Sequence, residues 1–199
     1  LLEPPSPVLL PRPMSVASVR RTAHGPVVGF LYAPVGAGTH ALAALGPGAR
    51  LSVLGPLGRG FPLAVGGTPV LIAGGRGVAP LLFAAEVLER QGRRCEFLFG
   101  ARDAEHLVGL ADARRRLDGM GGRLRLATDD GSRGFRGTVV QLLDRIAAHL
   151  PAPRVLHACG PHAMLAGVAR WGMRHGAPTF LAMESVMACG TGVCRGCPL

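Results

Sequence analysis

The chain has 199 residues, of which 48% are hydrophobic and 17% are charged, so it is long enough to bury a sizeable core. Its formal net charge is +10, but the basic residues are spread along the chain and only 5% of residues are aromatic, which argues against a nucleic-acid-binding protein. No apolar run approaches the roughly 18 residues of a membrane-spanning helix. With no basic leader before an apolar signal core, the sequence predicts a cytoplasmic protein that does not span a membrane.

Residues 1–65 are rich in glycine and proline and contain three short apolar or alternating runs, at 14–19, 27–32 and 50–54. Such runs are typical of strands in a small barrel or sheet. Two motifs in this region suit phosphate groups. Arg12 stands with Ser15 at a strand start, and a guanidinium can pair with a pyrophosphate through two hydrogen bonds. Residues 35–39 form a glycine turn whose amides donate to phosphate oxygens. An ordinary strand entry and an ordinary turn explain these two motifs equally well.

From residue 66 onward, predicted strands and helices alternate along the chain. This alternation indicates a parallel sheet with helices on both faces, and therefore an α/β domain over residues 66–180. A cysteine-rich segment over residues 181–199 would follow it. The expected strands are 69–73, 94–99, 123–127 and 154–158, and the expected helices are 79–91, 110–117, 138–149 and 162–175.

A first glycine-rich turn follows the buried strand at 69–73. The strand breaks at Gly74, Gly75 and Gly77, and Pro80 can open the helix that comes next. Glycines let the backbone approach a ligand closely, and the free amides of a helix start attract phosphate. The turn therefore indicates a dinucleotide site, with simple packing as the alternative. Its spacing differs from G-x-G-x-x-G, so no acidic ribose contact is assumed.

A second turn of the same kind is formed by Cys159, Gly160 and Pro161 after the strand at 154–158. In an open parallel sheet, both turns would lie at the carboxyl ends of strands, where ligands bind. Cys159 then suits a place beside a nicotinamide ring, although a small buried hydrophobic side chain is the plainer interpretation. His162, the next residue, is the histidine with the most favourable position for function.

Three of the five cysteines, Cys189, Cys194 and Cys197, lie in the last eleven residues. Their spacing, C-x4-C-x2-C, matches the first three ligands of plant-type 2Fe-2S clusters. The glycines between them favour a tight loop whose amides point at the sulfurs. A structural zinc site is the alternative, but such sites usually offer paired C-x2-C motifs and four ligands. A fourth cysteine of the right spacing is not in the sequence.

Taken in order, these segments resemble the ferredoxin-reductase-like superfamily, and most closely the electron-transfer subunits of class 1B dihydroorotate dehydrogenases. The flavin motifs of that family are R-P-x-S, L-Y-x and a G-T turn, and they are matched here by Arg12, Pro13, Met14 and Ser15, by Leu31, Tyr32 and Ala33, and by Gly38 and Thr39. Its other motifs are G-P-L-G-x-G-F, G-G-x-G-V-x-P, T-D-D-G-S, C-G-P and M-A-C-G-x-G-x-C-x-x-C, found here at 55–61, 74–80, 128–132, 159–161 and 187–197.

The resemblance implies a partial FAD-binding antiparallel β-barrel (1–65), an NAD-binding parallel α/β domain (66–180) and the start of a 2Fe-2S segment (181–199). FAD would place its pyrophosphate on Arg12 and the Gly38-Thr39 turn, and its ring against Met14, Ser15 and Tyr32. NAD would lie over the two glycine turns, and the three terminal cysteines would hold the cluster. No residue of the chain has to act as a general acid or base, because the cofactors supply the chemistry.

The resemblance further implies a partner, the FMN-containing catalytic subunit of dihydroorotate dehydrogenase, in a heterotetramer of two subunits of each kind that serves pyrimidine (UMP) biosynthesis. It also predicts more barrel strands before Arg12 and a fourth cysteine after Cys197. Two other functions stay open: the flavin subunit of an NADPH:ferredoxin oxidoreductase or sulfhydrogenase, and a docking scaffold without cofactors. The choice between NAD and NADP is open as well, since Arg102 suits an adenosine phosphate no better than it suits an ordinary surface position.

Overall fold

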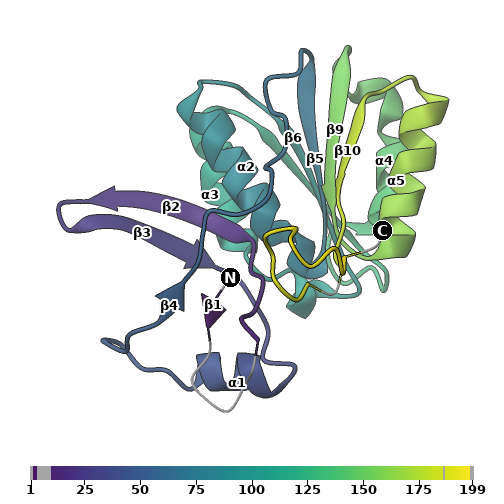
Figure 1. The fold of residues 1–199 in the computed structure, drawn as a ribbon. Coiled ribbons are helices and arrows are strands. Elements are labelled where there is room, and N and C mark those ends of the chain that lie inside the picture. The colour runs from purple at the N-terminus through teal and green to yellow at the C-terminus, as the bar shows by residue number, and fades with distance from the viewer. Residues whose placement is uncertain (1, 4–9, 186, 198–199) are drawn as a thin grey trace. The chain divides into compact units, whose positions relative to one another are not determined.

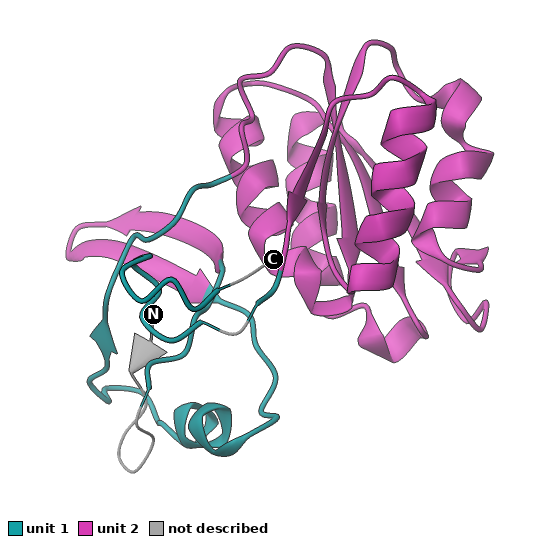
Figure 2. Ribbon diagram, turned by 45° about the vertical axis from the view of Figure 1, so that its right-hand side comes forward, with its two compact units in different colours: residues 1–15, 30–60, 184–199 teal, residues 16–29, 61–183 magenta. Residues whose placement is uncertain are grey.

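The computed structural model describes residues 2–3, 10–185 and 187–197 (Figure 1). The chain divides into two compact units (Figure 2). The first unit holds the described residues of 1–15, 30–60 and 184–199, and the second holds residues 16–29 and 61–183. Within the described part of the chain, no helix combines the length and the apolar character that crossing a membrane requires.

The second unit is built on a six-stranded parallel sheet in the order β10-β9-β5-β6-β7-β8. Figure 1 shows α2 and α3 together on one face and α4 and α5 together on the other. The strands are β5 (Thr68–Gly74), β6 (Glu96–Ala101), β7 (Arg123–Thr128), β8 (Phe135–Arg136), β9 (Arg154–Cys159) and β10 (Thr179–Ala182). The helices are α2 (Val78–Arg90), α3 (Leu110–Met120), α4 (Val139–Arg145) and α5 (His162–Arg174), with short 3-10 turns at Gly75–Gly77, Ala104–His106 and Ala147–His149.

The core of this unit follows from the run of apolar residues in its central strand. Residues 69–74 of β5 are all buried, because helices cover both faces of the sheet. On one face, Ile72 and Leu156 pack with the inner sides of α4 and α5, where Leu143 and Trp171 are fully buried. The alternating strands and helices predicted for residues 66–180 are thereby confirmed, apart from two short strands at the sheet edges, β8 and β10, that the sequence did not indicate.

A two-stranded hairpin, β2 (Val16–Thr22) and β3 (Gly25–Phe30), belongs almost entirely to the second unit, where β2 packs against α2. The first unit contains a second pair of strands, β1 (Leu2–Glu3) and β4 (Ser52–Val53), which run antiparallel. The antiparallel strands expected in residues 1–65 are therefore present, as two separate pairs. The prediction of a glycine turn over residues 35–39 was wrong, because Gly38 and Thr39 lie inside a short helix, α1 (Ala37–Ala43).

Candidate functional site

The two glycine-rich turns lie side by side at the carboxyl edge of the parallel sheet. Their strands, β5 and β9, are hydrogen-bonded neighbours, with Ala73 opposite Cys159. From β5 the chain builds the sheet in one direction through β6 and β7, and it then returns to add β9 and β10 on the other side. The β5–β9 boundary is thus the topological switch point, which is where open α/β sheets bind ligands.

The turns touch through their backbones, and this contact explains why glycine is needed in both. A Cβ atom at Gly77 would overlap the carbonyl group of Cys159, and one at Gly160 would lie 3.0 Å from the Cα atom of Gly74. At Gly74 a Cβ atom would lie 2.5 Å from the sulfur of Met164. Gly75 has a φ of +52°, which favours glycine for its conformation. The predicted glycines therefore let two strand-to-helix turns share one edge.

Two helices begin at this edge with amides suited to anions. α2 starts after Gly77 and α5 starts after Pro161, and neither start has a side-chain cap or an acidic residue in its first turn. Pro80 lies in the first turn of α2, where its fixed φ suits the helix. The positive ends of two helix dipoles therefore lie at the sheet edge that carries the glycine turns. Cys159 is 5% exposed there, while His162 is exposed.

A buried histidine beneath this edge was not singled out by sequence analysis. His157 on β9 is 1% exposed, with ring contacts to Phe61 and Phe180 at 5.5 Å between centroids. Neither ring nitrogen has a hydrogen-bond partner of good geometry. Burial lowers the pKa of His157, and the charge of Arg93 acts in the same direction, so the ring is neutral near pH 7. An apolar strand position, which sequence periodicity would fill with a hydrophobic residue, here holds a polar ring.

The loops that follow β6 and β7, residues 102–104 and 129–132, form a polar rim next to the switch point. The amides of Asp129 and Asp130 donate to the carbonyls of Ala101 and Arg102, at 3.1 and 3.2 Å, so the two loops run together. Ser132 ties the loops a second time, because its hydroxyl accepts the amide of Ala104 at 2.8 Å. Two hydrogen bonds from Ser132, one from its hydroxyl and one from its amide, lower the pKa of Asp130.

In the same rim, Arg102 is held by its neighbours. Its Nε lies 3.2 Å from a carboxylate oxygen of Asp103 and 3.2 Å from Nδ1 of His106. A hydrogen bond from the side chain of His106 lowers the pKa of Asp103, which keeps this carboxylate charged across the neutral range. The carboxylate of Asp103 therefore partly neutralises the charge of Arg102 at this edge.

The residues predicted to bind flavin lie in the first unit. The guanidinium of Arg12 donates to the carbonyl oxygen of Leu10, at 2.8 and 3.2 Å. The hydroxyl of Thr39 accepts hydrogen bonds from the amides of Val35 and Gly36, at 2.9 and 3.1 Å, and so stabilises the start of α1. Met14, Leu31, Tyr32 and Ala33 are half-buried, whereas Pro13 and Ser15 are exposed. None of these placements tests flavin binding, and the assignment stays a prediction.

The terminal cysteines show part of the arrangement that a cluster needs. The sulfurs of Cys189 and Cys194 lie 3.2 Å apart, and the amide of Thr191 donates to Cys189 at 3.4 Å. Hydrogen bonds from Thr191 and Cys194 lower the pKa of Cys189 to about 5, which favours the thiolate form that binds iron. Cys197 is not part of this pair, and over residues 2–3, 10–185 and 187–197 no three potential ligands are close enough to hold a metal. The assignment of Cys189, Cys194 and Cys197 as cluster ligands therefore stays a prediction.

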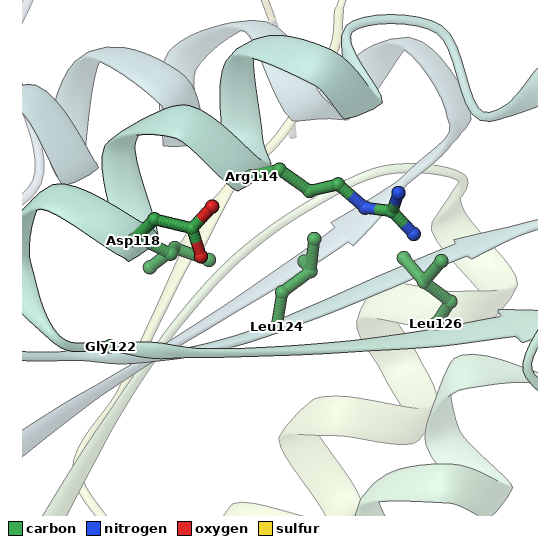
Figure 3. A pocket seen from close by; sticks show the side chains of 6 residues that line it. Arg114, Asp118, Gly122, Leu124 and Leu126 are labelled. Atoms are coloured by element: carbon green, nitrogen blue, oxygen red, sulfur yellow. The ribbon is translucent and has the colours of Figure 1, made fainter.

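A separate hollow lies between α3 and β7 and has no role in this site. Figure 3 shows Arg114 and Asp118 of α3 on one side and Leu124 and Leu126 of β7 on the other. The hollow has a volume of about 380 Å³. No residue of either glycine turn lines it, so it is not connected to the dinucleotide-type edge.

The chain is similar both to solved structures and to curated relatives. No family model matches the chain. A solved structure of an NADH-dependent reduced ferredoxin-NADP oxidoreductase is similar with a TM-score of 0.81 and 26% identity, over 94% of this chain and 66% of that one. The dihydroorotate dehydrogenase B (NAD(+)) electron transfer subunit of Desulforamulus reducens is 36% identical over 95% of this chain and 70% of its own length. The subunit of the same name from Geobacillus thermodenitrificans is 34% identical over 95% of this chain and 70% of its own length.

The parallel sheet with two glycine turns at its switch point, together with the antiparallel strand pairs, defines a protein of the ferredoxin-reductase-like class. Within that class, the identity and coverage of the curated relatives decide the family. The chain belongs to the family of dihydroorotate dehydrogenase B (NAD(+)) electron transfer subunits. The resemblance expected from the sequence motifs is confirmed.

Proposed function

We propose that this chain is the electron-transfer subunit of a dihydroorotate dehydrogenase in pyrimidine biosynthesis. It carries electrons from the FMN of a catalytic subunit, through a 2Fe-2S cluster and FAD, to NAD+. The observation that carries the proposal is the backbone contact between the two glycine turns at the switch point, which brings the starts of α2 and α5 to one edge of the sheet. Membership of the family supplies the identity of the reaction.

The residues of the second unit bind and orient the dinucleotide. The amides at the starts of α2 and α5 receive the pyrophosphate, since phosphate is stabilised by unpaired N–H groups at the positive end of a helix. Gly74, Gly75 and Gly77 allow the ligand to approach the backbone, and the Cys159–Pro161 turn forms the adjacent wall where the nicotinamide ring lies. The close approach of Gly160 to Gly74 keeps the two turns in contact, and Pro80 lies in the first turn of the helix that follows the first of them. These residues position the reacting ring and need not exchange protons themselves.

The first unit holds the other two groups. Arg12 and the start of α1 at Gly38 and Thr39 bind the flavin pyrophosphate, and the segments Pro13–Ser15 and Leu31–Ala33 line its ring. Cys189, Cys194 and Cys197 are ligands of the iron pair. When bound, these groups supply the exchange between hydride transfer and single-electron transfer. The short loop at 189–194 contributes an amide that stabilises thiolate charge at Cys189.

The partner is the FMN-containing catalytic subunit, in an assembly of two subunits of each kind, and the protein works in the cytoplasm. A second function, the flavin subunit of an NADPH:ferredoxin oxidoreductase, is favoured by one observation. The similar solved structure is described as a ferredoxin-NADP oxidoreductase, at 26% identity. Because both functions use the same fold, the nucleotide and the electron acceptor distinguish them.

The test is spectroscopic and uses the full-length chain purified without oxygen together with its catalytic partner. We expect a yellow-brown complex whose flavin bands bleach when NADH is added and when dihydroorotate is added. Bleaching by NADPH and not by NADH or dihydroorotate would instead support the oxidoreductase. A colourless complex, or one that contains zinc and no iron, would overturn both functions and leave a docking scaffold or a metal-binding module.

A further inference from the structure

The strand that follows the flavin motif is tied to the helix that follows the dinucleotide turn by a buried carboxylate. Glu86 lies on α2 and is 5% exposed. Its Oε1 accepts the backbone amide of Val19, in the middle of β2, at 3.2 Å. β2 begins at Val16, directly after Ser15 of the predicted flavin motif, while α2 begins directly after the first glycine turn. One side chain thus connects segments that adjoin two cofactor-binding motifs.

Arg90, one turn further along α2, completes the attachment. Its guanidinium donates to the carbonyl oxygen of Val19 and, at 2.5 Å, to Glu86. The N–H and the C=O groups of Val19 are therefore both bound by side chains of α2, as they would be by a neighbouring strand. This pairing gives β2 a single register against the helix, since moving the strand by one residue would present different backbone groups.

A third element fixes the carboxylate from the other side. Arg116 on α3 donates to Oε2 of Glu86 at 2.6 Å, and the side chain of Arg116 is 21% exposed. Glu86 accordingly has hydrogen bonds on both oxygens, from two arginines and one backbone amide. A buried carboxylate with this many donors holds one position, because every rotation would leave a buried charge unpaired.

We infer that Glu86 is a positioning residue for hydride exchange between the dinucleotide and the flavin. It does so by holding β2, the strand that directly follows the flavin motif, in one register on α2, the helix that directly follows the first glycine turn. Hydride transfer depends steeply on the placement of the two rings, so a small shift of β2 slows the reaction without weakening nucleotide binding. The inference rests on the proposed function, because it concerns the placement of the flavin motif.

The decisive variant is Glu86→Gln in the flavin-loaded complex with the catalytic partner. We expect amide exchange over residues 16–22 to rise about tenfold, since the local opening of β2 becomes easier. The rate constant of flavin reduction by NADH falls by about tenfold, whereas the dissociation constant of NADH stays within about twofold. Amide exchange in β5 and β9 does not change.

The matched control is Glu89→Gln, which removes the same charge from the same helix. Glu89 lies 3.7 Å from Arg116, its side chain is 37% exposed, and we expect both readouts to keep wild-type values. If Glu86→Gln folds poorly, Arg90→Gln replaces it, because this side chain is 54% exposed and its loss frees only the carbonyl of Val19 and one bond to Glu86. Its effects have the same direction and a smaller size.

A wild-type rate of flavin reduction in the folded variant would overturn the inference, even if exchange over β2 increases. An equal loss of rate and of NADH affinity would overturn it as well, because general damage would then explain the result. The proposed function fails in a different way: the wild-type complex would carry flavin that NADH does not reduce. The two failures are therefore separable in one set of proteins.

Discussion

The two units of the chain differ in how they are held together. In the second unit, the sheet buries large side chains such as Phe97, Leu98 and Trp171 completely. In the described part of the first unit, Leu42 is the sole buried hydrophobic side chain, whereas Val35, Val53 and Leu54 are more than half exposed. Since buried apolar area is the main source of folding free energy, the second unit has a core of its own, whereas the described residues of the first unit form very little of one.

The cysteines show the same contrast in chemical terms. Burial raises the pKa of Cys95, on the loop before β6, to about 12, and the nearby charge of Glu96 acts in the same direction. Cys189 in the first unit has its pKa lowered to about 5 by hydrogen bonds. A core thiol is kept neutral, while a surface thiol is prepared to be an anion. The second unit thus keeps its buried thiol protonated, whereas the first unit leaves Cys189 able to ionise.

The substitution with the largest predicted effect breaks the backbone contact between the two glycine turns of the second unit. Gly77→Ala places a Cβ atom against the carbonyl group of Cys159, and backbone cannot move aside as a side chain can. We expect the unfolding free energy to fall by about 2–4 kcal/mol, and nucleotide affinity to fall by at least about tenfold, because the two turns separate. Thermal unfolding and titration with NADH measure both quantities.

Gly66→Ala is the control for this substitution. A Cβ atom at Gly66 would meet no atom within 4 Å, and its φ does not lie in the left-handed region. The unfolding free energy should stay within about 0.5 kcal/mol of wild type. If Gly77→Ala were as well tolerated as the control, the close contact of the two turns could not be what fixes the dinucleotide edge.

The second prediction concerns alkaline pH and the buried thiol. The folded chain keeps Cys95 protonated up to about pH 12, whereas in the unfolded chain it ionises near its ordinary pKa of 9.0. The stabilisation is therefore complete below pH 9 and is lost as the pH rises toward 12. The unfolding free energy should fall by about 1.4 kcal/mol per pH unit in this window. The chain has no lysine and a single tyrosine, so few other groups compete.

Urea unfolding at pH 8 and pH 10.5 measures this slope. Cys95→Ala should be less stable than wild type at pH 8, because it leaves a small cavity, but its stability should decline less between the two pH values. Equal slopes in both proteins would show that Cys95 does not stay protonated in the folded core. Iodoacetamide at pH 9 gives an independent reading, since Cys95 should be modified only after unfolding.

The third prediction compares one helix cap from each unit. Thr138 caps α4 by accepting the amide of Gln141 at 3.2 Å, and Thr39 accepts two amides at the start of α1. Thr138→Ala should lower the unfolding free energy by about 1 kcal/mol and leave the flavin content unchanged. Thr39→Ala should lower the amount of bound flavin per chain, with Thr39→Ser retaining it. Absorbance at the flavin and protein bands gives the ratio, and full flavin content in Thr39→Ala would contradict the assigned flavin site.

These comparisons also show what the sequence could predict. The β5 strand and the α2 helix were expected to within two residues, because a buried apolar run and a helical pattern meet at a glycine turn. The α1 helix was missed, since its glycine-rich start resembles a loop and its stability depends on Thr39. The β10 strand is only four residues long and gives almost no periodic signal. Local pattern was enough for regular elements with a deep core.

Tertiary relations could not be predicted in the same way. That β5 and β9 are neighbours depends on the strand order, which no short-range pattern contains. The hydrogen bonds of Glu86 join residues 67 and 30 positions apart, so in sequence it was one more charged residue on a helix. His157 likewise sits at a position that alternation assigns to an apolar residue. The sequence motifs were enough to locate the candidate site, whereas the contacts that support it could be identified only from the folded structure.

The smallest predicted effect tests whether the polar rim restrains Arg102. Asp103 lies 3.2 Å from Arg102, and its other oxygen accepts the amide of His106 at 3.0 Å as a helix cap. Asp103→Asn removes the charge and keeps the cap, because asparagine caps a helix as well as aspartate does. Arg102 then becomes a stronger partner for a 2′-phosphate. We expect the affinity for NADP+ relative to NAD+ to rise only about threefold, because an exposed ion pair contributes little free energy.

The control for this change is Asp112→Asn, which breaks a more exposed pair: the side chain of Asp112 is 58% exposed, against 30% for Asp103, and lies 2.6 Å from Arg115 on α3. It removes the same charge from the unit at a place outside the β6–β7 rim. If both variants shift the nucleotide preference equally, net charge alone accounts for the change and Arg102 has no special role. If only Asp103→Asn shifts it, the carboxylate of Asp103 contributes to the preference for a dinucleotide that lacks the 2′-phosphate.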